Sequence, residues 1–194
     1  MKVLVFIGPS GSGKSTLIQE LVRREEVVVT PSWTTRPPRA NETGGDMNHR
    51  FVTDEEFTRL QNNGYFVEVI EMYGFRYGLP AIDLPPKDKI PAILVRAPLL
   101  HLVSAHYPEH IVYQIESDLE TAIERVGARQ TPRPEMEDRL RNYSDELALG
   151  RRLSHRVFDT AAPLAEVADS IERAIAEDFD GYSIAATTDH NRSR

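Results

Sequence analysis

The segment GPSGSGKS at residues 8–15 constrains the fold more than any other part of the sequence. It fits the pattern G-x-x-x-x-G-K-[ST] and directly follows the apolar run VLVFI. Glycines let consecutive backbone N–H groups converge on phosphate oxygens, and the start of a following helix adds partial positive charge. Leu17, Leu21 and Val22 give the next segment a helical apolar face, so a strand, a phosphate-binding loop and a helix are predicted in that order.

The side chains of this loop predict how a nucleoside triphosphate is held. Lys14 can bring its charge to the β- and γ-phosphates, and the Ser15 hydroxyl is a ligand for Mg²⁺. The alternative is a glycine-rich turn that matches by chance, and the strand and helix on either side disfavour it. We therefore expect a bound nucleoside triphosphate, with Mg²⁺. The expected binding residues are Gly8, Ser10, Gly11, Ser12, Gly13, Lys14, Ser15 and Thr16.

Five short apolar runs predict buried strands, at 3–7, 27–30, 92–95, 111–115 and 157–158. Such runs separated by helical segments are typical of a parallel sheet covered on both faces. The expected fold is α/β of the P-loop NTPase type. It has a five-stranded parallel sheet with helices on both faces, an inserted small acceptor-binding lobe and a helical lid.

Three later segments carry helix signals. Residues 117–120, SDLE, form a capping-box pattern that starts at Ser117. Pro134 suits the first position of a second helix. The apolar positions expected to face the core share helical spacing. They are Leu119, Ile123 and Val126, then Met136, Leu140, Tyr143 and Leu147, and finally Leu164, Val167, Ile171 and Ile175.

The pattern of residue types changes between Ser32 and about Pro86. This segment has turn residues, a short predicted helix that starts at Thr53 and an apolar run at 65–73. We expect one domain at 1–179, with a core at 1–31 and 87–179. The acceptor-binding lobe is expected at 32–86 and the lid at 125–139. The polar, aperiodic segment 180–194 is expected to be disordered.

Composition restricts the class of partner. The net charge is −7 without a block of lysines or arginines, which argues against a nucleic-acid or anionic-membrane surface. No apolar run approaches the roughly 20 residues needed to span a bilayer. There are no cysteines and no signal-peptide pattern, so a cytoplasmic protein with small-molecule nucleotide substrates is expected. The sequence carries no signal for an oligomeric state.

Arg36 and Arg39 lie three residues apart in the proline-stiffened segment SWTTRPPR. Arginine side chains bind phosphate bidentately, which suits a doubly negative phosphomonoester. Taken alone, the pair could equally be two solvated loop charges. The surrounding motifs therefore decide how it is interpreted.

Together these motifs resemble guanylate kinase, from Lys2 to about Glu177. The phosphate loop, S-x-T-T-R-x-x-R, FV followed by EEF, Glu68 and the segment GFRYG occur in the family's order with suitable spacings. The resemblance implies that Arg36, Arg39 and Tyr77 hold the phosphate of GMP or dGMP. It also implies that Ser32 and Glu68 read guanine. A carboxylate can accept parallel hydrogen bonds from guanine N1–H and N2–H₂, a donor pair that adenine lacks.

The resemblance extends to the expected lid. Arg125, Arg129 and Arg139 correspond to the family arginines that close over the triphosphate. With Lys14 they are the expected catalytic residues, and the resemblance implies ATP as the phosphoryl donor. Phosphoryl transfer depends mainly on positioning and on cations beside the moving oxygens, with little need for a general base.

The sequence departs from the family pattern in three places. LVRA at 94–97 replaces a segment that usually carries acidic residues, and Arg96 there could contact phosphate or merely cover the sheet edge. His49 occupies the place of a phosphate-binding tyrosine and is retained as a candidate. The lid is proline-rich and one residue short, and Asp159 replaces an adenine-side asparagine.

These departures keep other functions open. Ribose 1,5-bisphosphate phosphokinases also resemble guanylate kinases and lack the acidic pair, but they generally lack the Glu68 and Arg39 equivalents. A kinase of a modified nucleotide is a further alternative. A non-enzymatic guanylate-kinase-like module is disfavoured because such modules characteristically lose the intact phosphate loop.

Overall fold

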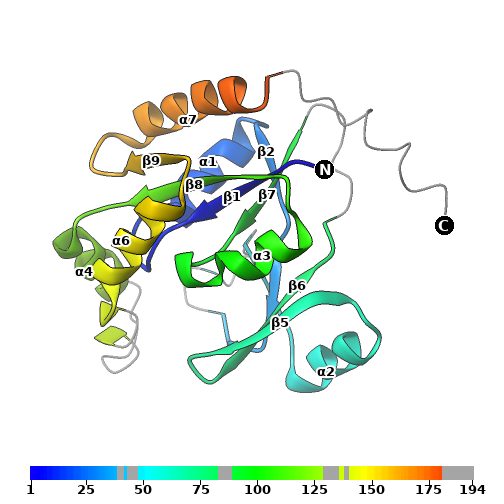
Figure 1. Cartoon of the computed structure of the whole chain (residues 1–194). Coiled ribbons are helices and arrows are strands. Elements are labelled where there is room, and N and C mark those ends of the chain that lie inside the picture. Colours follow the sequence, from blue (N-terminus) through cyan, green and yellow to red (C-terminus); the bar gives the residue numbers. More distant parts are fainter. Residues whose placement is uncertain (39–41, 43–47, 83–88, 129–135, 138–139, 181–194) are drawn as a thin grey trace.

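A computed structural model describes residues 1–38, 42, 48–82, 89–128, 136–137 and 140–180. Its central element is a five-stranded sheet in the order β2-β7-β1-β8-β9, and every neighbouring pair is parallel (Figure 1). The strands are β1 (Val3–Ile7), β2 (Val27–Val29), β7 (Ile90–Leu94), β8 (His110–Glu116) and β9 (Arg156–Asp159). The predicted α/β fold with a five-stranded parallel sheet is confirmed.

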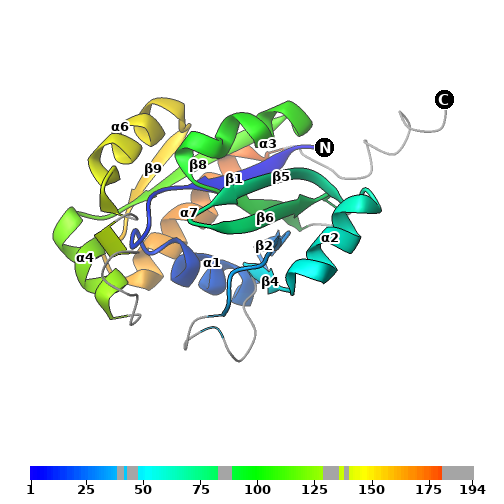
Figure 2. The same cartoon turned by 90° about the horizontal axis from the view of Figure 1, so that it is seen from below.

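Helices cover both faces of this sheet because its central strand is apolar on both sides. Leu4 and Phe6 of β1 pack with α1 (Lys14–Arg23) and α7 (Leu164–Asp178). The alternate residues of β1 pack with the 3₁₀ helix η2 (Ala97–Leu99), with α3 (Leu100–His106) and with Leu149 of α6 (Tyr143–Leu153). Figures 1 and 2 show α1 and α7 on one face, with α3 and α6 on the other.

The prediction for helix α4 (Leu119–Gly127) needs correction at its start and on its buried face. Its N-cap is Asp118, whose carboxylate accepts the Thr121 N–H, in place of Ser117. Ala122 and Val126 are buried, whereas Leu119 and Ile123 are each 43% exposed. A close approach to the phosphate loop explains this, because a Cβ on Gly11 would lie 2.6 Å from the Ala122 carbonyl oxygen. Only a small residue fits at position 122, beside Gly11.

The other two predicted helices agree in part. In α7, Val167, Ile171 and Ile175 are buried as expected, while Leu164 at the first position is 41% exposed. Helix α6 begins at Tyr143, after the N-cap residue Asn142. The expected helix start at Pro134 lies outside the described residues.

A second sheet of four strands follows β2 in the chain, in the order β4-β3-β6-β5. Its strands are β3 (Ser32–Thr34), β4 (His49–Phe51), β5 (Phe66–Met72) and β6 (Phe75–Pro80). Helix α2 (Asp54–Asn62) packs beside them, and the expected cap Thr53 accepts the Glu56 N–H. Tyr73 and Gly74 have positive φ values, 55° and 75°, which are typical of a tight hairpin turn. This turn joins β5 and β6, which pair as an antiparallel hairpin.

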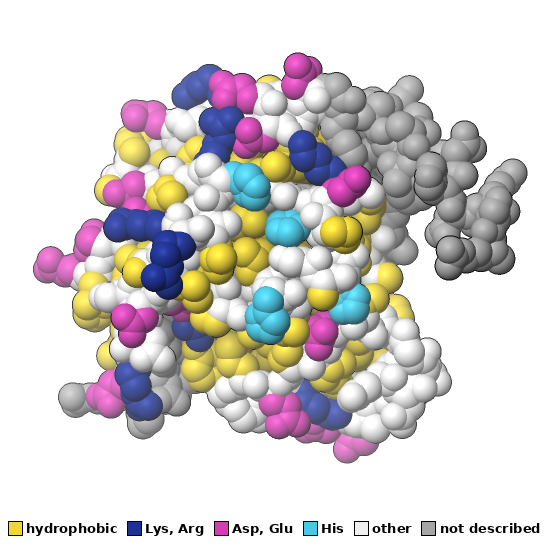
Figure 3. All heavy atoms as spheres, in the orientation of Figure 1, with side chains coloured by type: hydrophobic (Ala, Val, Ile, Leu, Met, Phe, Trp, Pro, Cys, Tyr) yellow, Lys and Arg dark blue, Asp and Glu magenta, His cyan; other side chains and the backbone are white. Residues whose placement is uncertain are grey.

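The charged surface, the lengths of the helices and the limits of the described residues complete the description of the fold. Basic and acidic side chains are interspersed on the face that Figure 3 shows. Among the described residues, no helix has both the length and the apolarity to cross a bilayer. The segment 181–194 and most of the expected lid lie outside the described residues. The division into core, lobe, lid and tail therefore stays a prediction.

Candidate functional site

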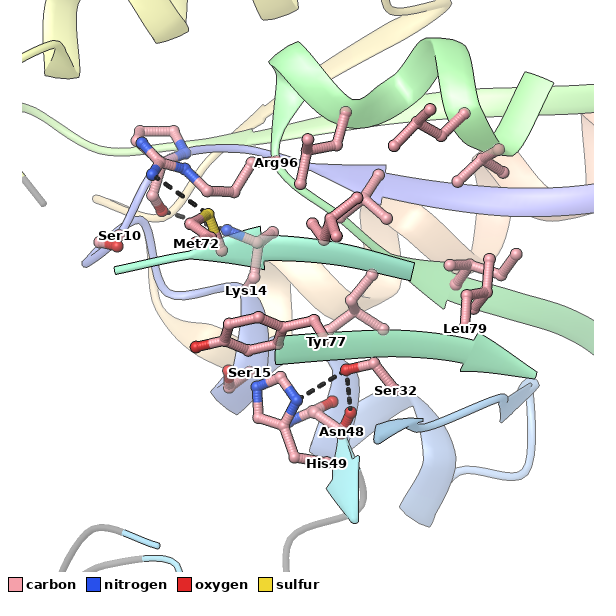
Figure 4. Close-up of a pocket in the computed structure, with 18 of the residues that line it drawn as sticks. Ser10, Lys14, Ser15, Ser32, Asn48, His49, Met72, Tyr77, Leu79 and Arg96 are labelled. Atoms are coloured by element: carbon pink, nitrogen blue, oxygen red, sulfur yellow. Dashed lines mark hydrogen bonds between the residues drawn. The ribbon is translucent and has the colours of Figure 1, made fainter. Parts of the chain in front are cut away.

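One cavity lies between the phosphate loop, the β5–β6 hairpin and the carboxyl end of β7 with η2 and α3 (Figure 4). The carboxyl ends of parallel strands are the usual ligand-binding edge of such sheets. Three groups of predicted residues line this cavity, from the loop, from the acceptor segment and from the hairpin. They are Ser10, Gly11, Ser12, Gly13, Lys14 and Ser15, then Ser32, Arg36 and His49, and then Glu68 and Tyr77.

Backbone geometry explains the glycines of the loop. Gly8, Gly11 and Gly13 have φ of 144°, 85° and 87°, which side chains rarely tolerate. A Cβ on Gly8 would lie 2.1 Å from the Ile115 carbonyl oxygen. These positions therefore require glycine, and the chain can curve tightly from β1 into α1. Gly8 supports the loop without lining the cavity.

Lys14 and Ser15 begin α1, where N–H groups lack intrahelical partners and attract anions. The Lys14 ammonium donates to the carbonyl oxygens of Gly8 and Pro9, at 3.1 Å for Pro9. Its charge thus lies over the loop on which a polyphosphate would rest. The other predicted loop residue, Thr16, is exposed and does not line the cavity.

Arg36 also lines the cavity and is only 4% exposed. Its guanidinium binds the Glu42 carboxylate bidentately, with Nη1–Oε2 at 2.8 Å and Nη2–Oε1 at 3.1 Å. It also lies 5.1 Å from the centre of the Phe51 ring. An arriving phosphate would therefore share Arg36 with Glu42 or displace that carboxylate. The second predicted arginine, Arg39, lies outside the described residues.

Ser32 and His49 face the same cavity from neighbouring strands β3 and β4 (Figure 4). The Ser32 hydroxyl lies 2.8 Å from His49 Nδ1. The His49 ring stands 6.2 Å from that of Tyr77, centre to centre. The structure thus brings together three polar side chains that sequence reasoning had assigned separately to base and phosphate.

Glu68 enters the cavity because β5 alternates its side chains. Glu68, Ile70 and Met72 line the cavity at two-residue spacing. The Glu68 carboxylate lies 3.4 Å from His106 Nε2 at the end of α3, and the neighbouring walls are apolar. Apolar walls around one carboxylate suit a flat base that offers hydrogen-bond donors. Arg36 and Glu68 therefore face one shared space.

Arg125 lies behind the phosphate loop and is not among the residues that line the cavity. It donates to the Gly11 carbonyl oxygen at 3.3 Å and to the Thr160 hydroxyl oxygen at 2.8 Å. The Thr160 hydroxyl in turn donates to the Ser12 carbonyl oxygen at 3.0 Å. In this arrangement Arg125 braces the loop, and its closure over the triphosphate stays a prediction. Arg129 and Arg139 lie outside the described residues.

Glu116, the last residue of β8, is a buried residue whose backbone carbonyl oxygen accepts from the Thr160 hydroxyl at 3.2 Å. Its carboxylate accepts hydrogen bonds from Arg151 Nε at 2.9 Å and Nη2 at 2.7 Å. The Arg151 guanidinium holds the pKa of Glu116 below its ordinary value. The carboxylate is therefore ionised and already engaged at neutral pH, as a structural anion would be.

Several residues around the cavity were missed or left undecided by sequence reasoning. Glu42 and His106 gave no signal, because their contacts with Arg36 and Glu68 depend on tertiary structure. Arg96, left open between two roles, lines the cavity. Only its position just after a buried strand of a parallel sheet could have indicated this.

Comparisons with known proteins identify similar sequences and a similar structure. A family model described as guanylate kinase matches residues 1–82. A guanylate kinase from Thermobifida fusca is 35% identical over 183 residues, covering 90% of this chain and 91% of the relative. One from Gloeobacter violaceus is 32% identical, with 92% and 88% covered. The solved guanylate kinase of Anaplasma phagocytophilum superposes with a TM-score of 0.68 at 24% identity, covering 91% and 85%. That structure supports the fold.

Proposed function

The chain belongs to the guanylate kinase family, and from that premise we propose that it transfers the γ-phosphoryl group of ATP to the phosphate of GMP or dGMP. The products would be ADP and the guanosine diphosphate. ATP and GMP are cytoplasmic metabolites, so the cytoplasm is the proposed site of this activity. The chain is a phosphotransferase whose substrates are small nucleotides.

The single observation that carries the proposal is that Lys14, Arg36 and Glu68 line one cavity. A cation for the donor polyphosphate, a cation for the acceptor phosphate and a carboxylate for the acceptor base thus share one space. Holding two reactants in line supplies much of the catalysis in phosphoryl transfer. The chain requires little further chemistry from its own residues.

Each part of the site has a proposed role in this reaction. The loop N–H groups and Lys14 hold the ATP phosphates, while Arg36 and Tyr77 hold the acceptor phosphate. Glu68 accepts the N1–H and N2–H₂ of guanine. Adenine in the same place would not offer this donor pair, so the guanine-specific hydrogen bonds to Glu68 would be lost.

Mg²⁺ fits the loop through the Ser15 hydroxyl, which lines the cavity. The described residues hold no group of three or more acidic, histidine or cysteine side chains that could bind a metal. Phosphate oxygens and water would therefore complete the coordination. When bound, the ion neutralises charge on the β- and γ-phosphates.

Guanine is favoured over the acceptor alternatives by Glu68. Ribose 1,5-bisphosphate has no base, so this carboxylate would find no donor pair in the cavity. A modified nucleotide would fit only if it kept the N1 and N2 donors. The intact phosphate loop argues against a purely peptide-binding module.

An acceptor panel tests the proposal. The protein is incubated with ATP and Mg²⁺ and with GMP, dGMP, AMP, UMP or ribose 1,5-bisphosphate, and ADP formation is measured. We expect turnover with GMP or dGMP at least about 100-fold above that with AMP. The control variant Lys14→Ala should abolish turnover with little change in melting temperature. Preference for AMP, UMP or the sugar phosphate would refute the proposed acceptor.

A further inference from the structure

We propose that Arg96 is a positioning residue of the acceptor site, acting as a latch that holds the tip of the β5–β6 hairpin over the phosphate loop. The inference rests on the proposed function, because the hairpin carries the residues assigned to the acceptor. Arg96 directly precedes η2, at the carboxyl end of β7, and lines the cavity beside Ser10 and Lys14 (Figure 4).

The first part of the latch is a fixed guanidinium. Arg96 Nε lies 2.9 Å from one Glu146 oxygen and 3.2 Å from the other, and Arg96 Nη2 also donates to this carboxylate. The Glu146 side chain, from α6, is 2% exposed. A bidentate pair of this kind fixes the plane of the guanidinium as well as its position. Arg96 is thus attached firmly to the parallel-sheet core.

The second part is the hairpin tip. The remaining nitrogen, Arg96 Nη1, donates to the Tyr73 hydroxyl and lies 4.0 Å from the Met72 sulfur. The guanidinium carbon lies 5.6 Å from the centre of the Tyr73 ring. Tyr73 occupies the tight turn between β5 and β6, which is the end of the hairpin farthest from its connection to β7. The contact therefore spans the two sheets.

This span explains how Arg96 would affect acceptor binding through the hairpin. Glu68 and Tyr77 lie on the two strands whose tip is latched. When the tip is docked, both side chains are held in the cavity before the acceptor arrives. If only a minor fraction of the molecules has the tip docked, the apparent affinity for the acceptor equals the intrinsic affinity multiplied by that fraction. Donor binding to the phosphate loop should change little.

Tyr73→Phe is the sharpest variant, because it keeps the ring and removes the hydroxyl. We expect KM for GMP to rise at least about 10-fold, as for loss of one hydrogen bond to a charged group, while kcat and KM for ATP stay within about twofold. Tyr65→Phe is the matched control, since Tyr65 precedes the same strand at its other end and is 43% exposed. It should leave all three constants unchanged.

Replacing the buried pair tests whether Tyr73 acts through Arg96. Arg96→Met with Glu146→Leu removes both charges together and so avoids leaving a buried charge unpaired. This double variant should raise KM for GMP at least as much as Tyr73→Phe. Adding Tyr73→Phe to it should have no further effect, because the two changes remove one interaction. Independent, multiplying effects would overturn the latch.

A distance measurement separates the latch from the identity of the acceptor. The sequence has no cysteine, so Glu55→Cys on α2 and Ala176→Cys on α7, both exposed, can be spin-labelled selectively. In ligand-free protein we expect one narrow distance distribution, broadened or lengthened by Tyr73→Phe and unaffected by Tyr65→Phe. An unchanged distribution in Tyr73→Phe would refute the latch. An acceptor panel without GMP turnover would refute the proposed function instead.

Discussion

At the residue scale, the most informative contact is the pair between Arg36 and Glu42. The guanidinium is 4% exposed and its bidentate partner is 11% exposed, so both charges are largely withdrawn from water. Such pairs matter most when one partner is removed, because the other is left buried and unpaired. A bound acceptor phosphate could then replace the missing carboxylate.

Glu42→Gln should therefore lower stability in a way that GMP partly reverses. Without ligand we expect a loss of about 2 kcal/mol, or roughly 4–8 °C in melting temperature for a chain of this size. With saturating GMP the difference in melting temperature between Glu42→Gln and wild type should become smaller. Glu56→Gln, in an exposed pair with Arg59 on α2, is the control and should cost no more than about 0.5 kcal/mol. An equal loss with and without GMP would show that the acceptor phosphate does not reach Arg36.

At the element scale, helix α4 shows how packing on a loop can override an apolar stripe. The spacing of Leu119, Ile123 and Val126 predicted one buried face, but Ala122 meets the phosphate loop and the two larger residues face outward. Sequence periodicity gives the presence of a helix and its approximate start. It does not give the side on which a glycine loop will approach.

This packing predicts opposite sensitivities on the two faces of α4. Ala122→Val should cost about 1–3 kcal/mol because the added methyl groups have no space beside Gly11. Leu119→Gln, on the exposed face, should stay within about 0.5 kcal/mol. Chemical denaturation of both variants would measure the difference. Equal losses in the free energy of unfolding for the two variants would mean that the face with Leu119 and Ile123 packs on the protein as closely as the face with Ala122.

At the scale of the whole molecule, the parallel core could be predicted from the sequence, whereas the residues that surround the site could be predicted only in part. Five apolar runs and one glycine-rich loop specify the sheet, because each buried strand must be apolar on both faces. The place of Glu68 in the cavity was implied only by the resemblance to guanylate kinase, and the alternation of β5 is what turns its side chain inward. The partners His106, Glu42 and Glu146 could not, since each comes from another element and meets its partner only after folding.

The central claim is that one cavity binds a polyphosphate at the loop and reads a guanine through Glu68. The most direct measurement is the ratio of kcat/KM for GMP to that for AMP in wild type, Glu68→Gln and Glu71→Gln. Glu71 lies on the same strand with its side chain exposed, so it is the matched control. We predict that Glu68→Gln lowers this ratio at least about 100-fold and that Glu71→Gln leaves it unchanged. An unchanged ratio in Glu68→Gln, or equal losses for both acceptors, would contradict the claim.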